Sequence, residues 1–153
     1  KTRTAGITAI AALVLSTFIS NVILKNAVMR PRPFVVLPQI IPLITHASGY
    51  SFPSGHTTAA FACAFVYYKL LPKFFGLPIM LLAVMVAFSR LYLGVHYPLD
   101  VLGGIVTAWF GSMLAIKSTA SNKIKMPLRR LFSFLLPLSK ILYTILFFII
   151  FLI

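Results

Sequence analysis

The sequence predicts an all-α fold, an integral membrane bundle of about five helices that forms a single domain over residues 1–153. Three observations predict it. Of the 153 residues, 60% are hydrophobic and 10% are charged, whereas a soluble domain carries about 25% charged residues. The mean hydropathy is +1.01. Apolar runs of up to about 20 residues recur along the chain, which is the length of a membrane-spanning helix.

Five apolar segments follow one another, and each is expected to be helical because a chain in lipid must satisfy its own backbone groups. They are residues 5–24, 57–71, 77–93, 99–116 and 131–153. Between the second and the third segment, Pro72, Lys73 and Gly76 are expected to form a short turn. Residues 94–98 predict a tight connection ahead of the fourth segment.

The stretch between the first two segments, residues 25–53, is polar and rich in proline. Proline lacks the backbone N–H that a helix interior needs, so this stretch is not expected to form one long helix. The prolines that break it include Pro31, Pro33, Pro38 and Pro42.

The charges are strongly one-sided, with 14 Lys and Arg residues against one acidic residue, Asp100. The cations lie between apolar runs and not along one helix face, which argues against a nucleic-acid partner. Alternate loops place nine of them on one side of the membrane. These are Lys1, Arg3, Lys69, Lys73, Lys117, Lys123, Lys125, Arg129 and Arg130. By the positive-inside rule this side is cytoplasmic, in a multi-pass protein of the plasma membrane.

The other side of the membrane carries fewer cations but all the candidate chemistry. Its cations are Lys25, Arg30, Arg32 and Arg90, and they accompany the three histidines and Asp100. The positive-inside rule predicts few cations in the loops on this side of the membrane. We therefore expect these four cations to belong to a site at the extracytoplasmic interface.

The residues Ser54, Gly55 and His56 directly precede an apolar run. This pattern is typical of a helix N-terminus with Ser54 as its cap. The free N–H groups of such an end also attract phosphate, and Gly55 lets a ligand approach the backbone. Taken alone, the pattern fits an ordinary capped helix better than a phosphate site.

His96 and Asp100 lie four residues apart across Pro98, which favours the first turn of a helix. Asp100 could accept a hydrogen bond from one ring nitrogen of His96 and leave the other nitrogen free as a nucleophile. The alternative is that Asp100 only caps the helix. Against that alternative, Asp100 is the only carboxylate in a setting where a charge is costly.

Two counts exclude classes of site. The single cysteine, Cys63, excludes an intrachain disulfide and a cysteine metal cluster. A two-metal site needs several carboxylates, and the chain has one. We therefore expect no metal and no cofactor. Positive side chains that suit a multiply charged oxyanion are instead available at Lys25, Arg32 and Arg90.

The three polar stretches together resemble the signature of the phosphatidic acid phosphatase type 2 superfamily. They are Lys25 followed after six residues by Arg32-Pro33, then Pro53-Ser54-Gly55-His56, then Ser89-Arg90 followed by His96 and Asp100. They cover residues 25–100, about half of the chain. Bacterial members usually have about two more spanning helices ahead of the first stretch, and the segment 131–153 lies outside the shared region.

The resemblance implies a helical membrane fold and a role for each matching residue. His96 is implied as the phosphorylated nucleophile, His56 as the acid that protonates the leaving group, and Asp100 as the carboxylate that orients His96. The phosphoryl oxygens are implied to bind Lys25, Arg32, Ser54, Gly55 and Arg90. Arg30 and His46 match no signature position, and we expect Arg30 to contact a headgroup and His46 to lie in a loop.

The expected activity is metal-independent hydrolysis of a lipid phosphomonoester or pyrophosphate, with the membrane and its phosphate-bearing lipid as partners. Undecaprenyl pyrophosphate and phosphatidylglycerol phosphate are the substrates that the resemblance favours. Two alternatives stay open. One is a lipid phosphotransferase, in which an alcohol replaces water in the second step. The other is a transporter or channel for phosphate lipids that has no catalytic activity.

Overall fold

The computed structural model describes residues 2–37, 39–41, 43 and 49–121, and these residues contain helices and no strand. The predicted all-α class is thus confirmed for the described part of the chain. By contacts the chain divides into two compact units, residues 1–117 and 118–153. The predicted fifth segment, residues 131–153, lies outside the described residues.

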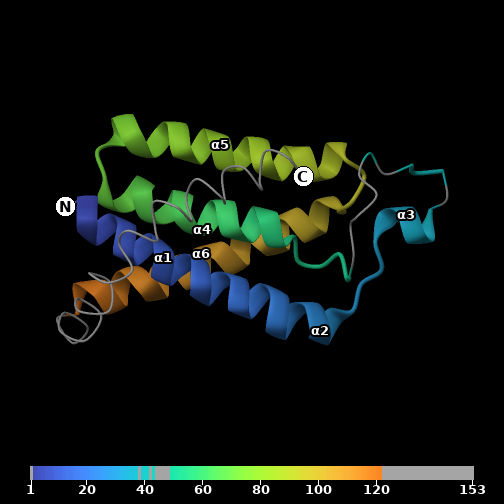
Figure 1. Ribbon diagram of the computed structural model, residues 1–153, viewed down its shortest axis with the longest axis horizontal. Coiled ribbons are helices and arrows are strands. Elements are labelled where there is room, and N and C mark those ends of the chain that lie inside the picture. The colour runs from blue at the N-terminus through green and yellow to red at the C-terminus, as the bar shows by residue number, and fades with distance from the viewer. Residues whose placement is uncertain (1, 38, 42, 44–48, 122–153) are drawn as a thin grey trace. The chain divides into compact units, whose positions relative to one another are not determined.

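The first unit begins with one long helical stretch. Helix α1, Thr2–Phe18, continues through a π-helical turn η1, Ile19–Leu24, into the single turn α2, Lys25–Val28 (Figure 1). The helix therefore runs four residues past the predicted boundary and carries Lys25 on its last turn. Beyond it, residues 25–53 are broken as predicted, with the short helix α3, Pro33–Val36, as the other helical piece described there.

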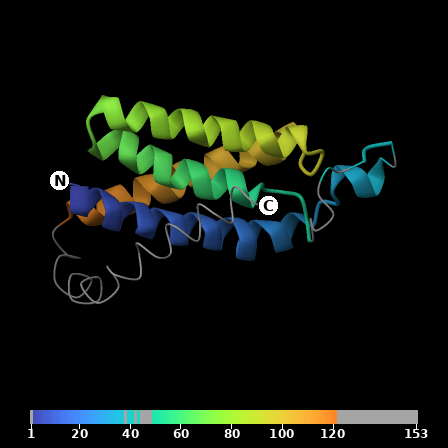
Figure 2. The same ribbon diagram turned by 45° about the horizontal axis from the view of Figure 1, so that its top comes forward.

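Three longer helices complete the bundle: α4, Gly55–Leu70, α5, Lys73–Tyr92, and α6, Pro98–Ala120. Figures 1 and 2 show α4 between α1 and α5, with α6 crossing behind. Three stretches are long and apolar enough to span a membrane, namely Thr2–Val36, Lys73–Tyr92 and Pro98–Ala120. Helix α4 has 16 residues and falls short of that length.

Small residues hold the helices of this bundle together. The buried core is largely alanine, and it includes Ala9 and Ala12 of α1 and Ala62 of α4. Since lipid offers no hydrophobic drive for helices to associate, close contact through small side chains supplies the packing. At the crossing of α6 and α4, the Ser112 hydroxyl lies 3.1 Å from the carbonyl oxygen of Ala62.

The predicted turn at Pro72, Lys73 and Gly76 is too long, because α5 already begins at Lys73 and includes Gly76. A Cβ atom at Gly76 would lie 2.7 Å from the Cα atom of Tyr68 on α4. This glycine is thus present for close packing of two helices and not for a turn. The predicted connection at residues 94–98 is confirmed, with Gly94 at a φ of +70°.

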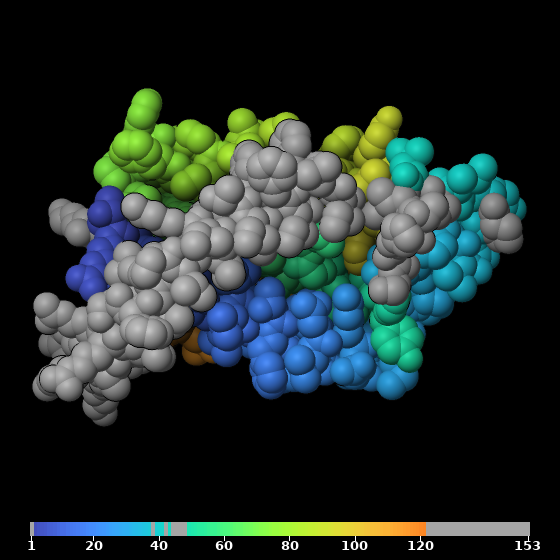
Figure 3. Space-filling model, viewed as in Figure 1, coloured from blue at the N-terminus to red at the C-terminus, as the bar shows by residue number. Residues whose placement is uncertain are grey.

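Large apolar side chains cover the outer surface of α5. Phe74 and Phe88 are 81% and 66% exposed, and the helix forms the green edge of the space-filling view (Figure 3). A contiguous apolar surface of this kind is what a lipid-facing helix presents.

Both ends of the bundle carry cations. The start of α1 and the α4–α5 turn lie at one end, with Arg3, Lys69 and Lys73. The turn α2, the start of α4, the end of α5 and the start of α6 lie at the other end (Figure 1). We call this second end the site end, because the three polar stretches of the sequence meet there.

Candidate active site

The start of α4 is built around Ser54. Its buried hydroxyl accepts a hydrogen bond from the Thr57 N–H at 3.4 Å and lies 2.9 Å from Thr57 Oγ1. The predicted helix cap is therefore confirmed. The Ser54 N–H donates to the carbonyl oxygen of Asp100 at 2.9 Å. This bond joins the second polar stretch directly to the third.

The start of α6 is capped by Asp100, the third residue of the helix. Its Oδ2 atom accepts a hydrogen bond from the Tyr97 N–H at 2.8 Å, which is the reciprocal half of a capping box. The Asp100 side chain is 0% exposed. Asp100 thus caps the helix, and this is compatible with its contact to His96.

His96 lies beside the same carboxylate oxygen. Its Nδ1 atom is 3.6 Å from Asp100 Oδ2, which is longer than a hydrogen bond but within reach of a charged pair. Catalytic hydrogen bonds are often this long before substrate tightens them. The ring is buried, and Nδ1 has no hydrogen-bond partner among the described residues. The Asp100 carboxylate lies within reach of that nitrogen after a small shift of either side chain.

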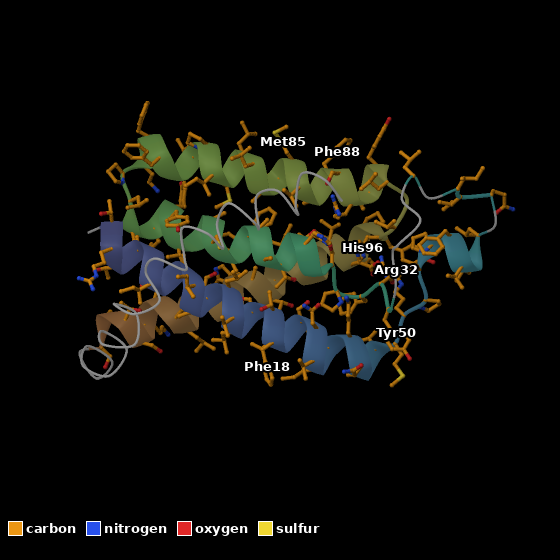
Figure 4. All side chains as sticks on the ribbon, in the orientation of Figure 1. Phe18, Arg32, Tyr50, Met85, Phe88 and His96 are labelled. Atoms are coloured by element: carbon orange, nitrogen blue, oxygen red, sulfur yellow. The ribbon has the colours of Figure 1, made fainter. Side chains whose placement is uncertain are left out.

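Arg32 holds the chain that leads to His96. Its Nη1 group donates to the carbonyl oxygen of Val95 at 3.2 Å, and its Nε donates to that of Gly49 at 3.0 Å. The guanidinium is buried and lies near His96 at the site end (Figure 4). Arg32 therefore joins three segments in addition to supplying a positive charge.

The other two predicted phosphate ligands also lie at the site end. Arg90 is buried near the end of α5, and its Nε donates to the Ser89 hydroxyl at 3.1 Å. Lys25 is partly buried at the start of α2. The structure thus gathers Lys25, Arg32 and Arg90 close enough to the start of α4 to act on His56 there. Gly55 itself packs against Asn21, whose side-chain oxygen would lie 3.0 Å from a Cβ atom at this position.

His56, the first residue after Gly55, interacts electrostatically with these cations. The pKa of His56 is lowered to about 4, and the largest cause is partial burial of the ring. Smaller contributions come, in order, from Arg90, His96, Lys25 and Arg32. The ring is consequently neutral near pH 7. A phosphate dianion bound among the same cations would offset their charge and raise the pKa of His56. Proton donation by His56 would then be coupled to the binding of an anion.

Arg30 is the residue whose place sequence reasoning missed. Its Nη1 group donates to Asp100 Oδ1 at 3.0 Å, and its guanidinium lies 3.9 Å from the centre of the Tyr97 ring. The expected headgroup contact of Arg30 stays a prediction, and the structure adds an ion pair with Asp100, the only acidic residue of the sequence. The need of a buried Asp100 for a counter-ion was a usable signal, but three other cations competed for that role. His46 lies outside the described residues.

Together these groups can do nucleophilic chemistry on a phosphate. The site offers an imidazole beside a buried carboxylate, a second imidazole at a helix N-terminus and three surrounding cations. Nucleophile, charge partner, proton donor and anion-binding groups are the parts that phosphoryl transfer through a covalent intermediate requires.

Comparison with known proteins gives consistent matches. A family profile described as "PAP2 superfamily" matches residues 5–124. The chain is 42% identical over 104 residues to undecaprenyl-diphosphatase BcrC of Bacillus subtilis (strain 168), which covers 68% of this chain and 50% of that protein. It therefore spans about half the length of that curated relative.

Two solved structures are similar as well. The crystal structure of Aquifex aeolicus LpxE superposes with a TM-score of 0.68 at 30% identity, covering 75% of this chain and 68% of that one. The transmembrane PAP2 type phosphatidylglycerolphosphate phosphatase from Bacillus subtilis gives a TM-score of 0.60 at 30% identity, covering 80% and 61%.

Proposed function

Because the chain belongs to the PAP2 superfamily, we propose that it is a membrane enzyme that removes phosphate from a lipid through a phosphohistidine on His96. The observation that carries the proposal is the pairing of buried His96 with buried Asp100, 3.6 Å apart, at the end of the bundle that also carries His56. The catalytic groups and the anion-binding cations all come from residues 25–100.

In the first step the Nε2 atom of His96 attacks phosphorus, and the bond from phosphorus to the lipid oxygen breaks. His56 transfers its proton to that oxygen, so the lipid leaves as a neutral alcohol or as a protonated phosphate. The His96 ring gains positive charge in this step. Asp100 stabilises that charge strongly because the pair is shielded from water.

In the second step water attacks the phosphohistidine, and the bond between phosphorus and nitrogen breaks. His56, now neutral, takes the proton from water, which restores both histidines and releases inorganic phosphate. Lys25, Arg32 and Arg90 balance the charge on the phosphoryl oxygens in both steps. No step needs a metal ion, which agrees with a chain that has one carboxylate.

We propose undecaprenyl pyrophosphate or phosphatidylglycerol phosphate as the substrate class. The names of the relative and of one structural neighbour support these two lipids. Both present a terminal phosphate to the same cluster of cations, and both carry an apolar tail that the exposed surfaces of the helices can accommodate.

The test is release of inorganic phosphate from a panel of lipid phosphates by purified protein in detergent, with and without a chelator. We expect release in both conditions and none from a His96→Ala variant. Loss of activity in chelator that magnesium restores would overturn the metal-free mechanism. A protein that binds these lipids but never releases phosphate would instead support the transporter alternative.

We also propose that the site end faces the extracytoplasmic side of the plasma membrane. The cations of the opposite end, among them Lys69 and Lys73, support this orientation. In a Cys63→Ala background, a cysteine at Tyr50 should react with a membrane-impermeant thiol reagent in intact cells. A cysteine at Lys69 should stay protected. The reverse pattern would place the site on the cytoplasmic side.

A further inference from the structure

The carboxylate of Asp100 has a separate partner for each oxygen. Oδ2 accepts from the Tyr97 N–H at 2.8 Å and lies 3.6 Å from His96 Nδ1. Oδ1 accepts from Arg30 Nη1 at 3.0 Å. The Asp100 side chain is fully buried, while that of Arg30 is 32% exposed. Arg30 is thus the link between the inner carboxylate and the surface of the site.

Arg30 also touches the neighbour of His96 in the chain. Its guanidinium lies 3.9 Å from the ring centre of Tyr97, at cation–π distance. Tyr97 is therefore held from two directions, by Asp100 at its N–H group and by Arg30 at its ring. Both contacts restrain the peptide that joins Tyr97 to His96.

The backbone around Arg30 is tightly constrained. The preceding residue, Met29, ends α2 in the left-handed conformation at a φ of 48°, which costs an ordinary residue roughly 1–2 kcal/mol. The carbonyl oxygen of Arg30 accepts from the N–H of buried Ser51 at 2.8 Å, and the Ser51 hydroxyl lies 3.1 Å from the Pro31 carbonyl oxygen. Such strain persists where the surroundings fix the conformation, commonly at functional sites.

Direct contact distinguishes Arg30 from the other site cations. Arg30 forms an ion pair with Asp100 at 3.0 Å. Arg32 donates to the carbonyl oxygens of Gly49 and Val95, and Arg90 donates to the Ser89 hydroxyl. The charge of Asp100 acts on Arg32 as well, so the ion pair, and not charge alone, singles out Arg30.

We infer that Arg30 is a positioning residue, which holds Oδ1 of Asp100 so that Oδ2 stays directed at the Tyr97 N–H and at His96. Without that bond, rotation of the carboxylate would exchange the two oxygens and weaken its hold on the His96 ring. This inference rests on the proposed function, since it assigns Arg30 to the same catalytic apparatus.

The test compares Arg30→Gln and Arg30→Lys with wild type, using a soluble short-chain lipid phosphate. Arg30→Gln should lower kcat roughly tenfold to a hundredfold and change KM less than about threefold, because Arg30 acts through Asp100 and not on the substrate. Arg30→Lys should restore part of kcat, since lysine keeps the charge but not the planar fork. The matched control is Lys73→Gln, which removes a cation lying 3.4 Å from the ring centre of Tyr68 at the opposite end. It should leave both constants unchanged.

A double-mutant comparison separates positioning from other roles. In an Asp100→Asn background, Arg30→Gln should cost almost nothing more, because the partner of Arg30 is already altered. A full additional loss there would overturn the inference. So would a rise in KM with kcat intact, which would make Arg30 a headgroup contact. Should Arg30→Gln fail to fold, the same outcomes are read from Arg30→Lys.

The two proposals fail in distinguishable ways. If wild-type protein shows no phosphate release that depends on His96, the proposed function fails. If release depends on His96 and Asp100 but both Arg30 variants match wild type, the function stands and only the positioning role is wrong.

Discussion

The site end and the body of the bundle differ in how far along the sequence their polar side chains bond. In the body, hydroxyls mostly bond to their own helix, as Thr8 does to the Thr4 carbonyl and Thr17 to the Leu13 carbonyl, at 2.8 and 2.6 Å. At the site end, local bonds such as that of Arg90 to Ser89 also occur, but Arg30 bonds to Asp100 and Arg32 to Val95, far along the sequence.

The difference has a physical cause. In lipid a backbone or hydroxyl group must find a partner nearby, and the helix itself provides one at the lowest cost. Bonds between distant segments need side chains that are long and charged. Such side chains are costly in a membrane, so they are found there mainly at functional sites. Substitutions at the site end should therefore reduce turnover, whereas substitutions in the body should reduce the stability of the fold.

The largest expected effect is that of His96→Ala. Removing the proposed nucleophile should lower turnover on the order of ten-thousandfold or more, because no covalent intermediate can form. Sulfate should still bind, since its oxygens would contact the cations. Turnover and sulfate binding are measured on the same preparation. Substantial residual phosphate release would remove His96 from its role.

Asp100→Asn should lower turnover roughly a hundredfold to ten-thousandfold, by analogy with other orienting carboxylates. The amide keeps the shape of the side chain but loses the charge that stabilises the His96 ring. Adding Asp100→Asn to His96→Ala should cost nothing further. A second full loss in that background would show that Asp100 acts independently of His96.

His56→Ala should slow turnover of a lipid phosphate roughly a hundredfold, within the range of a general acid. A substrate with an activated leaving group, such as p-nitrophenyl phosphate, needs no proton at its departing oxygen and should be affected much less. The ratio of the two losses is the measurement. Equal losses for the two substrates would mean that His56 is not the acid.

Gly76→Ala tests the body of the bundle. The new Cβ atom would lie 2.7 Å from the Tyr68 backbone, so α4 and α5 must separate, at a cost of about 1–3 kcal/mol. Gly6→Ala is the matched control, because a Cβ there meets nothing within 4 Å. The unfolding midpoint in detergent should fall for Gly76→Ala alone. Equal midpoints for both variants would contradict the close crossing.

The smallest expected effect concerns pH. The pKa of His56 is lowered to about 4, and a bound anion raises it, so anion binding takes up a proton between the two values. Sulfate inhibition should therefore weaken as pH rises above 4, by up to about tenfold per pH unit. His56→Gln should show a shallower slope. Identical slopes would show that the proton is not taken up by His56.

Much of the protein follows from the sequence alone, because composition and local pattern decide it. The apolar runs predict the helices, since a backbone in lipid has few alternatives. The caps at Ser54 and Asp100 depend on neighbours within three residues, so they too can be read locally. The meeting of the three polar stretches follows from helices that alternate in direction.

Other features were decided by the tertiary structure, because they depend on contacts between distant segments. From the sequence, Gly76 is predicted to be a turn residue, whereas in the structure it packs against the backbone of α4. Arg30 reads as one surface cation among several, and only the folded chain pairs it with Asp100, 70 residues away. Local patterns record what a residue does to its own helix. Which cation reaches a buried carboxylate is decided by the geometry of the whole bundle.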